Sequence, residues 1–296
     1  MKILVTGKNG QLGQSLQKII HQVDLVNKYF FTGKDDLDFN NSDSFKKFFS
    51  KNNFDAIINC AAYTNVDQAE KEFLLAYHLN HVVVKELAKI ANERNIKLIH
   101  ISTDYVFDGE SLNLYDEKNL TNPINIYGKS KNNGEQSILN LMSHNGLIIR
   151  TSWLYSEFGN NFLKTMLKLG IEKDSIDVVN DQIGSPTYAS DLAMTILDIL
   201  RHETFSKNKF KTEVYHYSNI GNISWFDFAK EIFKQTNLKC KINPTSSENF
   251  KQIAKRPKFS TLNTNKIYEI FKIKSLPWKS SLEKCIESNF SNFIYK

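Results

Sequence analysis

The segment NPINIYGKSKNNGE, residues 122–135, places Tyr127 four residues before Lys131. Residues i and i+4 of a helix lie on one face, so a helix here would point both side chains the same way. Such a pair suits the donation of a proton to a carbonyl oxygen while a nicotinamide delivers a hydride to the carbonyl carbon. We predict that Tyr127 is the proton donor. Lys131 would lower its pKa from the usual value of about 10 and hold the nicotinamide ribose.

A second pair of polar residues follows the apolar run KLIHIS at 97–102, which predicts a buried strand. Ser102 and Thr103 would then lie at the carboxyl edge of a sheet, where Thr103 could donate to the same carbonyl oxygen. The plainer alternative is a solvated lysine and an amphipathic tyrosine at the start of an ordinary helix. The glycine-rich turn at the start of the chain favours the catalytic interpretation.

That turn reads TGKNGQLG, with glycines at positions 7, 10 and 13. Gly7 would allow a tight turn after the first strand, and Gly10 would let the backbone approach a pyrophosphate. Gly13 would let the following helix lie close to the sheet, and the helix N-terminus would offer N–H donors. The pattern predicts a dinucleotide site, the alternative being a purely structural turn.

The second predicted strand ends in TGKDDLDF, where a basic residue, Lys34, precedes two aspartates. A basic residue there favours the 2′-phosphate of NADPH, whereas an acid favours NADH. We predict NADPH and leave NADH open. Further cofactor contacts are expected from residues after the second and third strands: Asp38, Phe39, Ala61 and Ala62.

The elements that position these residues alternate in type. Strands are predicted at 2–6, 28–32, 55–60, 97–102 and 146–150, and helices at 11–20, 42–52, 72–95 and 125–143. Apolar strands separated by helices predict a Rossmann-like α/β fold, a doubly wound parallel sheet, over residues 1–150. Residues 151–296, with helices at 160–170 and 190–202 and an isolated strand at 213–218, predict a smaller α/β substrate-binding lobe. A return of the chain to the first domain is left open.

Composition narrows the function classes. The 296 residues are 41% hydrophobic with a net charge of +6 spread along the chain, so we expect no nucleic-acid partner. Residues 251–284 hold nine Lys or Arg against two Glu, which indicates either a solvated surface or a site for an anion. No apolar run reaches the roughly 18 residues that span a bilayer, and no signal peptide is recognisable. The three cysteines lack metal-like spacing, so we expect a cytoplasmic protein with reduced thiols and no metal.

Several motifs resemble those of the extended short-chain dehydrogenase/reductase family: GKNGQLG (7–13), NCAAYTNVDQAE (59–70), STDYVFDG (102–109) and NIYGKSKNNGE (125–135). Four more resemble one subgroup of nucleotide-sugar reductases: RTSWLYSEFGNNF (150–162), NDQIGSPTYASDLA (180–193), SWFDFA (224–229) and KRPKFSTLNT (255–264). The resemblance covers nearly the whole chain. It implies NADPH- or NADH-dependent reduction of the 4-keto group of a dTDP-linked 6-deoxy sugar.

The resemblance also implies roles for individual residues. Those expected to be catalytic are Thr103, Tyr127 and Lys131, and those at the cofactor are Gly10, Gln11, Leu12, Asp38, Phe39, Ala61, Ala62, Tyr63 and Ser102. Asp104 and Trp153 match positions near the sugar nucleotide, although Trp153 could equally be a core aromatic. We choose Arg256 for the diphosphate because a guanidinium can hold two phosphate oxygens at once, the alternative being a surface arginine.

One departure concerns assembly. Some members of the family dimerise through magnesium held by glutamates, and Ser15 and Ser190 stand at the matching positions here. We therefore predict no structural magnesium and a monomer or weak homodimer. Two other functions stay open: a nucleotide-sugar epimerase or dehydratase of the same family, and a non-catalytic regulatory subunit. A dehydratase would need an Asp–Glu pair where this chain has Asp104 and Tyr105, and a regulatory subunit would not need all three catalytic residues.

Overall fold

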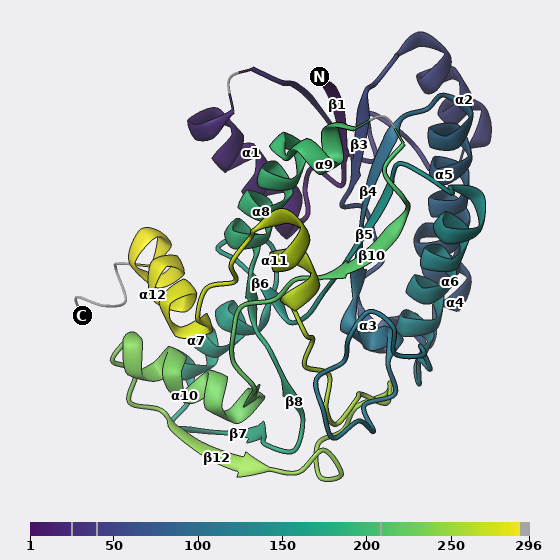
Figure 1. The fold of residues 1–296 in the computed structure, drawn as a ribbon. Coiled ribbons are helices and arrows are strands. Elements are labelled where there is room, and N and C mark those ends of the chain that lie inside the picture. Colours follow the sequence, from purple (N-terminus) through teal and green to yellow (C-terminus); the bar gives the residue numbers. More distant parts are fainter. Residues whose placement is uncertain (25, 40, 208, 291–296) are drawn as a thin grey trace.

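The computed structural model describes residues 1–24, 26–39, 41–207 and 209–290 (Figure 1). Its centre is a six-stranded sheet with the strand order β10-β5-β4-β3-β1-β2. All neighbouring strands run parallel. The predicted doubly wound parallel sheet is therefore confirmed. The strands are β1 (Lys2–Thr6), β2 (Lys28–Thr32), β3 (Ala56–Asn59), β4 (Lys97–Thr103), β5 (Gly146–Thr151) and β10 (Glu213–His216).

Helices cover both faces of this sheet, which is why the middle residues of its central strands are mostly apolar and buried (Figure 1). One face carries α1 (Gln11–Val23), α8 (Ala189–Arg201), α9 (Glu203–Ser206) and α11 (Asn265–Phe271). The other carries α2 (Ser42–Lys51), α5 (Val83–Glu93) and α6 (Ile126–Leu141), and α4 (Phe73–Tyr77) packs against α6. The helix predicted over 72–95 is present, but a π-helical turn, His78–Val82, separates α4 from α5.

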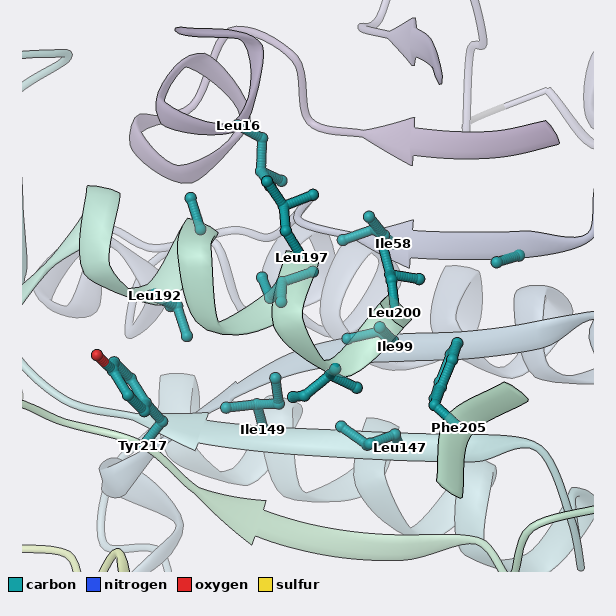
Figure 2. Packing of buried hydrophobic residues seen from close by; sticks show 14 of the residues in the cluster. Leu16, Ile58, Ile99, Leu147, Ile149, Leu192, Leu197, Leu200, Phe205 and Tyr217 are labelled. Carbon is teal, nitrogen blue, oxygen red and sulfur yellow. The ribbon is translucent and has the colours of Figure 1, made fainter. Parts of the chain in front are cut away.

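The core on the α8 face is a layer of mostly aliphatic side chains with aromatic rings such as those of Phe205 and Tyr217 (Figure 2). Leu192, Leu197 and Leu200 of α8 belong to this layer, and Leu197 lies beside Leu16 of α1. All three are buried, as are the isoleucines that they meet on the central strands: Ile58, Ile99 and Ile149.

The strand predicted as an isolated element at 213–218 is β10, the sixth strand of the central sheet, where it pairs with β5. Its placement as an isolated strand was therefore wrong. The preceding helix α8 packs against α1, so residues 189–216 return to the cofactor half of the chain. The apolar pattern identifies a strand, but it does not identify the strand's neighbour in the sheet.

The remaining segments form a layer near the carboxyl ends of the strands (Figure 1). Its own core lies among α7 (Phe162–Glu172), β7 (Ser175–Val179), α10 (Trp225–Gln235), β12 (Lys241–Thr245) and α12 (Trp278–Asn289). Shorter elements nearby are α3 (Val66–Ala69), the 3₁₀ turn Asp104–Val106, β6 (Leu154–Tyr155), β8 (Ile183–Gly184), β9 (Thr187–Tyr188) and β11 (Ile223–Ser224). Among the described residues, none of the helices has the length and apolar character needed to cross a bilayer.

Replacing Leu197 with alanine should test the central role of α8. Its side chain is fully buried, so we expect the free energy of unfolding to fall by about 2–5 kcal/mol through lost burial and a new cavity. The same change at Leu112, which is 96% exposed, should alter it by less than about 0.5 kcal/mol. Urea denaturation measures both, and equal effects would contradict the packing described for α8.

Candidate active site

Helix α6 begins in close contact with the 3₁₀ turn that follows β4. Asn125 caps the helix by accepting a hydrogen bond from the Gly128 N–H at 2.7 Å. A Cβ on Gly128 would overlap the carbonyl oxygen of Tyr105, so only glycine permits this approach. The rings of Tyr105 and Tyr127 meet edge to face with centroids 5.8 Å apart. The contact brings Tyr127 to the end of β4, as the sequence predicts.

Thr103 and Asp104 form a buried polar pair at this edge of the sheet. The Thr103 hydroxyl donates to Oδ1 of Asp104 at 3.0 Å and accepts from the Tyr105 N–H at 3.2 Å. Burial raises the pKa of Asp104 to about 7, although hydrogen bonds from Ser260 and Thr103 oppose the rise. Asp104 is therefore a carboxyl group that carries a proton over part of the neutral pH range.

The pKa of Tyr127 moves in the direction opposite to our prediction. The pKa of Tyr127 is raised to about 12, mainly by burial; a hydrogen bond from Thr103 opposes this rise and the nearby Asp104 adds to it. The predicted lowering by Lys131 is wrong for this structure, because the lysine directs its amine elsewhere. The sequence does correctly predict that Tyr127 and Thr103 lie close to each other.

Lys131 is only 1% exposed, which is unusual for a lysine. Its Nζ donates to the carbonyl oxygen of Ile101 at 2.6 Å and lies 3.4 Å from Nε2 of His100. Burial lowers the pKa of Lys131 to about 8, and the charges of Glu135 and Cys60 raise it in part. The Lys131 amine therefore lies against β4, close to the carboxyl end of this strand. Lys131 itself belongs to α6, the helix that also carries Tyr127.

The glycine turn has the shape that a dinucleotide needs. Gly7 has a φ of +75°, and a Cβ on Gly13 would overlap the carbonyl oxygen of Gly7. Gly10 precedes α1 and no side chain caps the helix, which leaves its N-terminus to a phosphate. Ser102 adds a buried hydroxyl for which the described residues offer no hydrogen-bond partner. A nicotinamide carboxamide would satisfy that hydroxyl, so these residues fit the predicted cofactor.

Gln11 and Leu12 could bind a pyrophosphate only through their backbone. The side-chain oxygen of Gln11 accepts from Ser156 and Asn161, each at 2.9 Å, and its nitrogen donates to the carbonyl oxygen of Leu154 at 3.2 Å. Leu12 is buried in the core. The Gln11 side chain thus ties the glycine turn to the segment that follows β5, a contact that the sequence did not reveal.

The end of β2 holds a basic pair of which the sequence analysis found one member. Lys34 is exposed in the turn after β2. Lys8, from the glycine turn, makes an ion pair with Asp36 at 2.5 Å, and Asp36 also accepts from the Gly33 N–H at 2.8 Å. Lys8 was missed because only the parallel pairing of β1 with β2 brings the two turns together.

The other residues predicted at this end have mixed environments. Phe39 packs against the core with its ring centroid 6.0 Å from that of Phe45, and its carbonyl oxygen contacts Nε2 of His78 at 3.0 Å. Asp38 is half-buried beside it. The Phe39 ring is therefore largely a core side chain, and its backbone borders the predicted adenine side.

The loop after β3 is fixed by a residue that the sequence analysis did not select. Ala61 and Ala62 are half-buried in this loop, and the Ala61 N–H donates to Oγ1 of Thr6 at 3.3 Å. Asn80 accepts from the Tyr63 N–H at 2.9 Å and donates to both the Tyr63 carbonyl and the Ser130 hydroxyl at 3.0 Å. It lies in the π-helical turn, a feature often found at functional sites. Asn80 thus connects the cofactor loop to α6.

Trp153 and Arg256, which are predicted near the substrate, have partners that the sequence did not predict. Trp153 has a φ of +45° and stacks on Trp225, with ring centroids 3.5 Å apart and planes 6° from parallel. Arg256 makes a two-point contact with Asp67, at 2.7 and 3.1 Å. Arg256 and Trp225 also line a cavity of about 620 Å³ whose other walls come largely from α7, β7 and residues 250–252. Trp153 is therefore partly a packing residue, and Arg256 is partly neutralised.

No group of three or more metal-ligating side chains exists among the residues that the structure describes. Ser15 of α1 is completely buried, and Ser190 is half-buried at the start of α8. A buried serine hydroxyl is a poor magnesium ligand beside the carboxylates that this cation prefers. The prediction of no structural magnesium rests on these two positions.

Residues 1–290 match the family described as the RmlD substrate binding domain. The chain belongs to this family. A curated RmlD relative, the dTDP-4-dehydrorhamnose reductase of Aggregatibacter actinomycetemcomitans, is 39% identical and covers 95% of this chain and 97% of its own length. The family resemblance noted in the motifs is thereby confirmed, and it extends far beyond the glycine turn.

Solved RmlD-family structures agree with this assignment. A dTDP-4-dehydrorhamnose reductase from Clostridium acetobutylicum superposes with a TM-score of 0.90 at 39% identity, covering 97% of this chain and 99% of its own. The enzyme of the same name from Bacillus anthracis, in complex with NADP, gives a TM-score of 0.89 at 40% identity with the same coverage. The fold and the order of its elements are therefore those of the RmlD family.

The raised pKa of Asp104 gives a stability test. A carboxyl group that stays protonated in the folded protein up to about pH 7, but ionises near 3.9 when unfolded, destabilises the fold increasingly as pH rises between these values. Asp104→Asn removes this penalty. Its free energy of unfolding relative to wild type should rise by about 2–3 kcal/mol from pH 5 to pH 8.

The matched control is Asp35→Asn, because Asp35 is exposed in the turn after β2. Its difference from wild type should stay the same at both pH values. Urea denaturation at pH 5 and pH 8 measures all three proteins, and a pH-independent effect of Asp104→Asn would show that this carboxyl is ionised throughout.

Proposed function

We propose that this chain reduces the C4 keto group of dTDP-4-dehydro-6-deoxy-L-mannose, forming dTDP-L-rhamnose, with NADPH as the preferred hydride donor. The observation that carries the proposal is the meeting of Thr103 and Tyr127 at the carboxyl edge of the sheet, the same edge at which the glycine turn follows β1. Relatives at 39–40% identity over nearly the whole chain are dTDP-4-dehydrorhamnose reductases, one of them solved with NADP.

The cofactor would lie across the carboxyl ends of β1 and β4, between the free N-terminus of α1 and the Ser102 hydroxyl. When bound, the nicotinamide supplies the hydride. Lys34 and Lys8 are the cations available for a 2′-phosphate, since Lys34 lies in the turn that ends β2 and Lys8 reaches this turn from the glycine turn to pair with Asp36. Asp36 already neutralises Lys8, so Lys34 has the larger part in the preference for NADPH.

The protein's own residues supply the proton. The Thr103 hydroxyl hydrogen-bonds the carbonyl oxygen and so fixes its position relative to Tyr127. Tyr127 then gives its phenolic proton to that oxygen as negative charge develops on it. An alcohol loses its proton at a pKa comparable with the roughly 15.7 of water, so transfer from a phenol of pKa about 12 runs downhill. Lys131, one helical turn from Tyr127, would hold the ribose.

The sugar nucleotide would extend from this edge into the 620 Å³ cavity. Its walls include the aromatic rings of Phe162, Trp225 and Phe250, which suit a nucleobase, and the guanidinium of Arg256 lies at the same cavity. Arg256 could then exchange its two carboxylate contacts with Asp67 for two phosphate oxygens. Asp104 and Trp153 would border the deoxysugar.

Tyr127→Phe tests the proton donor. We expect turnover with the 4-keto sugar to fall by about 10²–10⁴-fold, because the ring remains and only the proton is lost. The dissociation constant for NADPH should change by less than about threefold. The control, Tyr268→Phe, removes the hydroxyl of a largely exposed tyrosine and should keep normal turnover. Near-normal turnover in Tyr127→Phe would exclude it as the acid, and wild-type protein without turnover would favour a regulatory subunit.

Lys34→Ala tests cofactor preference. Removing one cation near the 2′-phosphate should weaken NADPH binding by about fivefold to tenfold at low salt, and NADH binding by less than twofold. Lys118→Ala, which removes an equally exposed cation from a distant loop, corrects for the change in net charge. Fluorescence titration of both cofactors measures the effect; an unchanged ratio of the two affinities would refute this role of Lys34.

A further inference from the structure

A row of polar residues crosses a sheet face that is otherwise apolar. Thr6 of β1, Asn59 of β3 and His100 of β4 lie side by side in register. Each is no more than 1% exposed, on the face that packs against α2, α5 and α6. Two positions earlier in the same strands, the residues on this face are apolar: Leu4, Ile57 and Leu98. Burying polar groups here costs free energy unless each group forms a hydrogen bond with its neighbour.

The hydrogen bonds along this row run in one direction. The Ala61 N–H, which can only donate, bonds to Oγ1 of Thr6 at 3.3 Å. The Thr6 hydroxyl donates to Oδ1 of Asn59 at 2.6 Å, which turns the amide nitrogen of Asn59 towards His100. That nitrogen lies 2.9 Å from Nδ1 of His100 and donates to it. A neutral imidazole that accepts at Nδ1 carries its proton on Nε2.

The Nε2–H of His100 then faces Lys131. Burial lowers the pKa of His100 well below its usual range, so the ring is neutral with one N–H. Nε2 lies 3.4 Å from Nζ of Lys131, whose other contact is its donation to the Ile101 carbonyl. An N–H can bond to an uncharged amine, which has a lone pair, but it opposes an ammonium, which has none.

We propose that Thr6, Asn59 and His100 form a one-way hydrogen-bonded chain that presents the Nε2–H of His100 to Lys131 and so favours the uncharged amine of that lysine. His100 is then a positioning residue, acting through Lys131 without touching the substrate. The chain begins at Ala61 and at the strand end before Gly7, both in predicted cofactor-binding segments. It therefore links the backbone around the cofactor to the protonation of Lys131.

The other charged groups around Lys131 are few. Glu135, one turn along α6, favours the ammonium, but Arg150 neutralises it through an ion pair at 2.6 Å. The thiol of Cys60 after β3 also favours the ammonium, and Tyr127 lies one turn back on the same helix. Burial opposes all of these and lowers the pKa of Lys131 to about 8. The His100 donor acts in the same direction as burial, from β4.

The inference concerns the same lysine as the proposed function, but its test needs neither substrate nor turnover. The pKa of Lys131 can be followed by carbon NMR of protein labelled at the lysine ε-carbon, with Lys131→Arg identifying the signal. His100→Leu removes the donor and should raise this pKa by about one unit, the size expected for one hydrogen bond that only one protonation state can make. His100→Gln keeps an acceptor and a donor on one side chain, so the pKa of Lys131 in this variant should stay within about 0.3 units of the wild-type value.

Thr6→Val changes a residue farther from Lys131 along the hydrogen-bonded chain. If His100→Leu does not fold, Thr6→Val alone tests the proposal. It removes the hydroxyl that orients Asn59, so the amide can turn, His100 can accept from the ammonium, and the pKa of Lys131 should again rise. Thr6→Ser keeps the hydroxyl and should match wild type. An unchanged or lowered pKa in His100→Leu or in Thr6→Val overturns the proposal. A shifted pKa in a protein that fails as a reductase would instead count against the proposed function.

Discussion

The close approach of α6 to the end of β4 is the constraint on which the candidate site depends. Gly128 lets the helix contact the carbonyl of Tyr105, and Asn125 fixes where the helix begins. Because the helix is rigid, this one contact sets the positions of Tyr127 and Lys131 together. It also buries both, and burial is the largest influence on the pKa of each. A bulkier residue at position 128 would displace the helix and with it both titrating groups.

The second half of the chain completes this site by returning to the first. Helix α8 covers the sheet face opposite α6 (Figure 2), and β10 closes the sheet beside β5. Two polar contacts then join the halves at the carboxyl edge: Gln11 with Ser156 and Asn161, and Asp67 with Arg256. The glycine turn and the predicted diphosphate residue are thus held by bonds between segments more than 140 residues apart. The residues predicted at the cofactor and those predicted at the substrate are thus joined by direct contacts.

How much of the fold and of the candidate site could be predicted depends on how far apart in the sequence the interacting residues lie. The glycine turn, the hydroxyls that end β4 and the spacing of Tyr127 and Lys131 are local patterns, and the structure brings them to one edge of the sheet. The place of β10, the Lys8–Asp36 pair and the role of Asn80 depend on which strands and helices become neighbours. Periodicity identifies an element and its buried face, but many other elements present the same apolar face. The direction of the Tyr127 pKa failed for a related reason, since it depends on where the Lys131 amine points.

The raised pKa of Tyr127 also determines which protonation state is present at neutral pH. A phenol whose pKa is about 12 is protonated at pH 7 in all but roughly one molecule in 10⁵. As the proposed proton donor, Tyr127 would therefore hold the proton that reduction requires before any substrate binds, whereas a low pKa would leave phenol and phenolate both populated. Like any catalytic group it would change the rates in both directions and not the equilibrium, so the pH and the cofactor ratio still set the net direction.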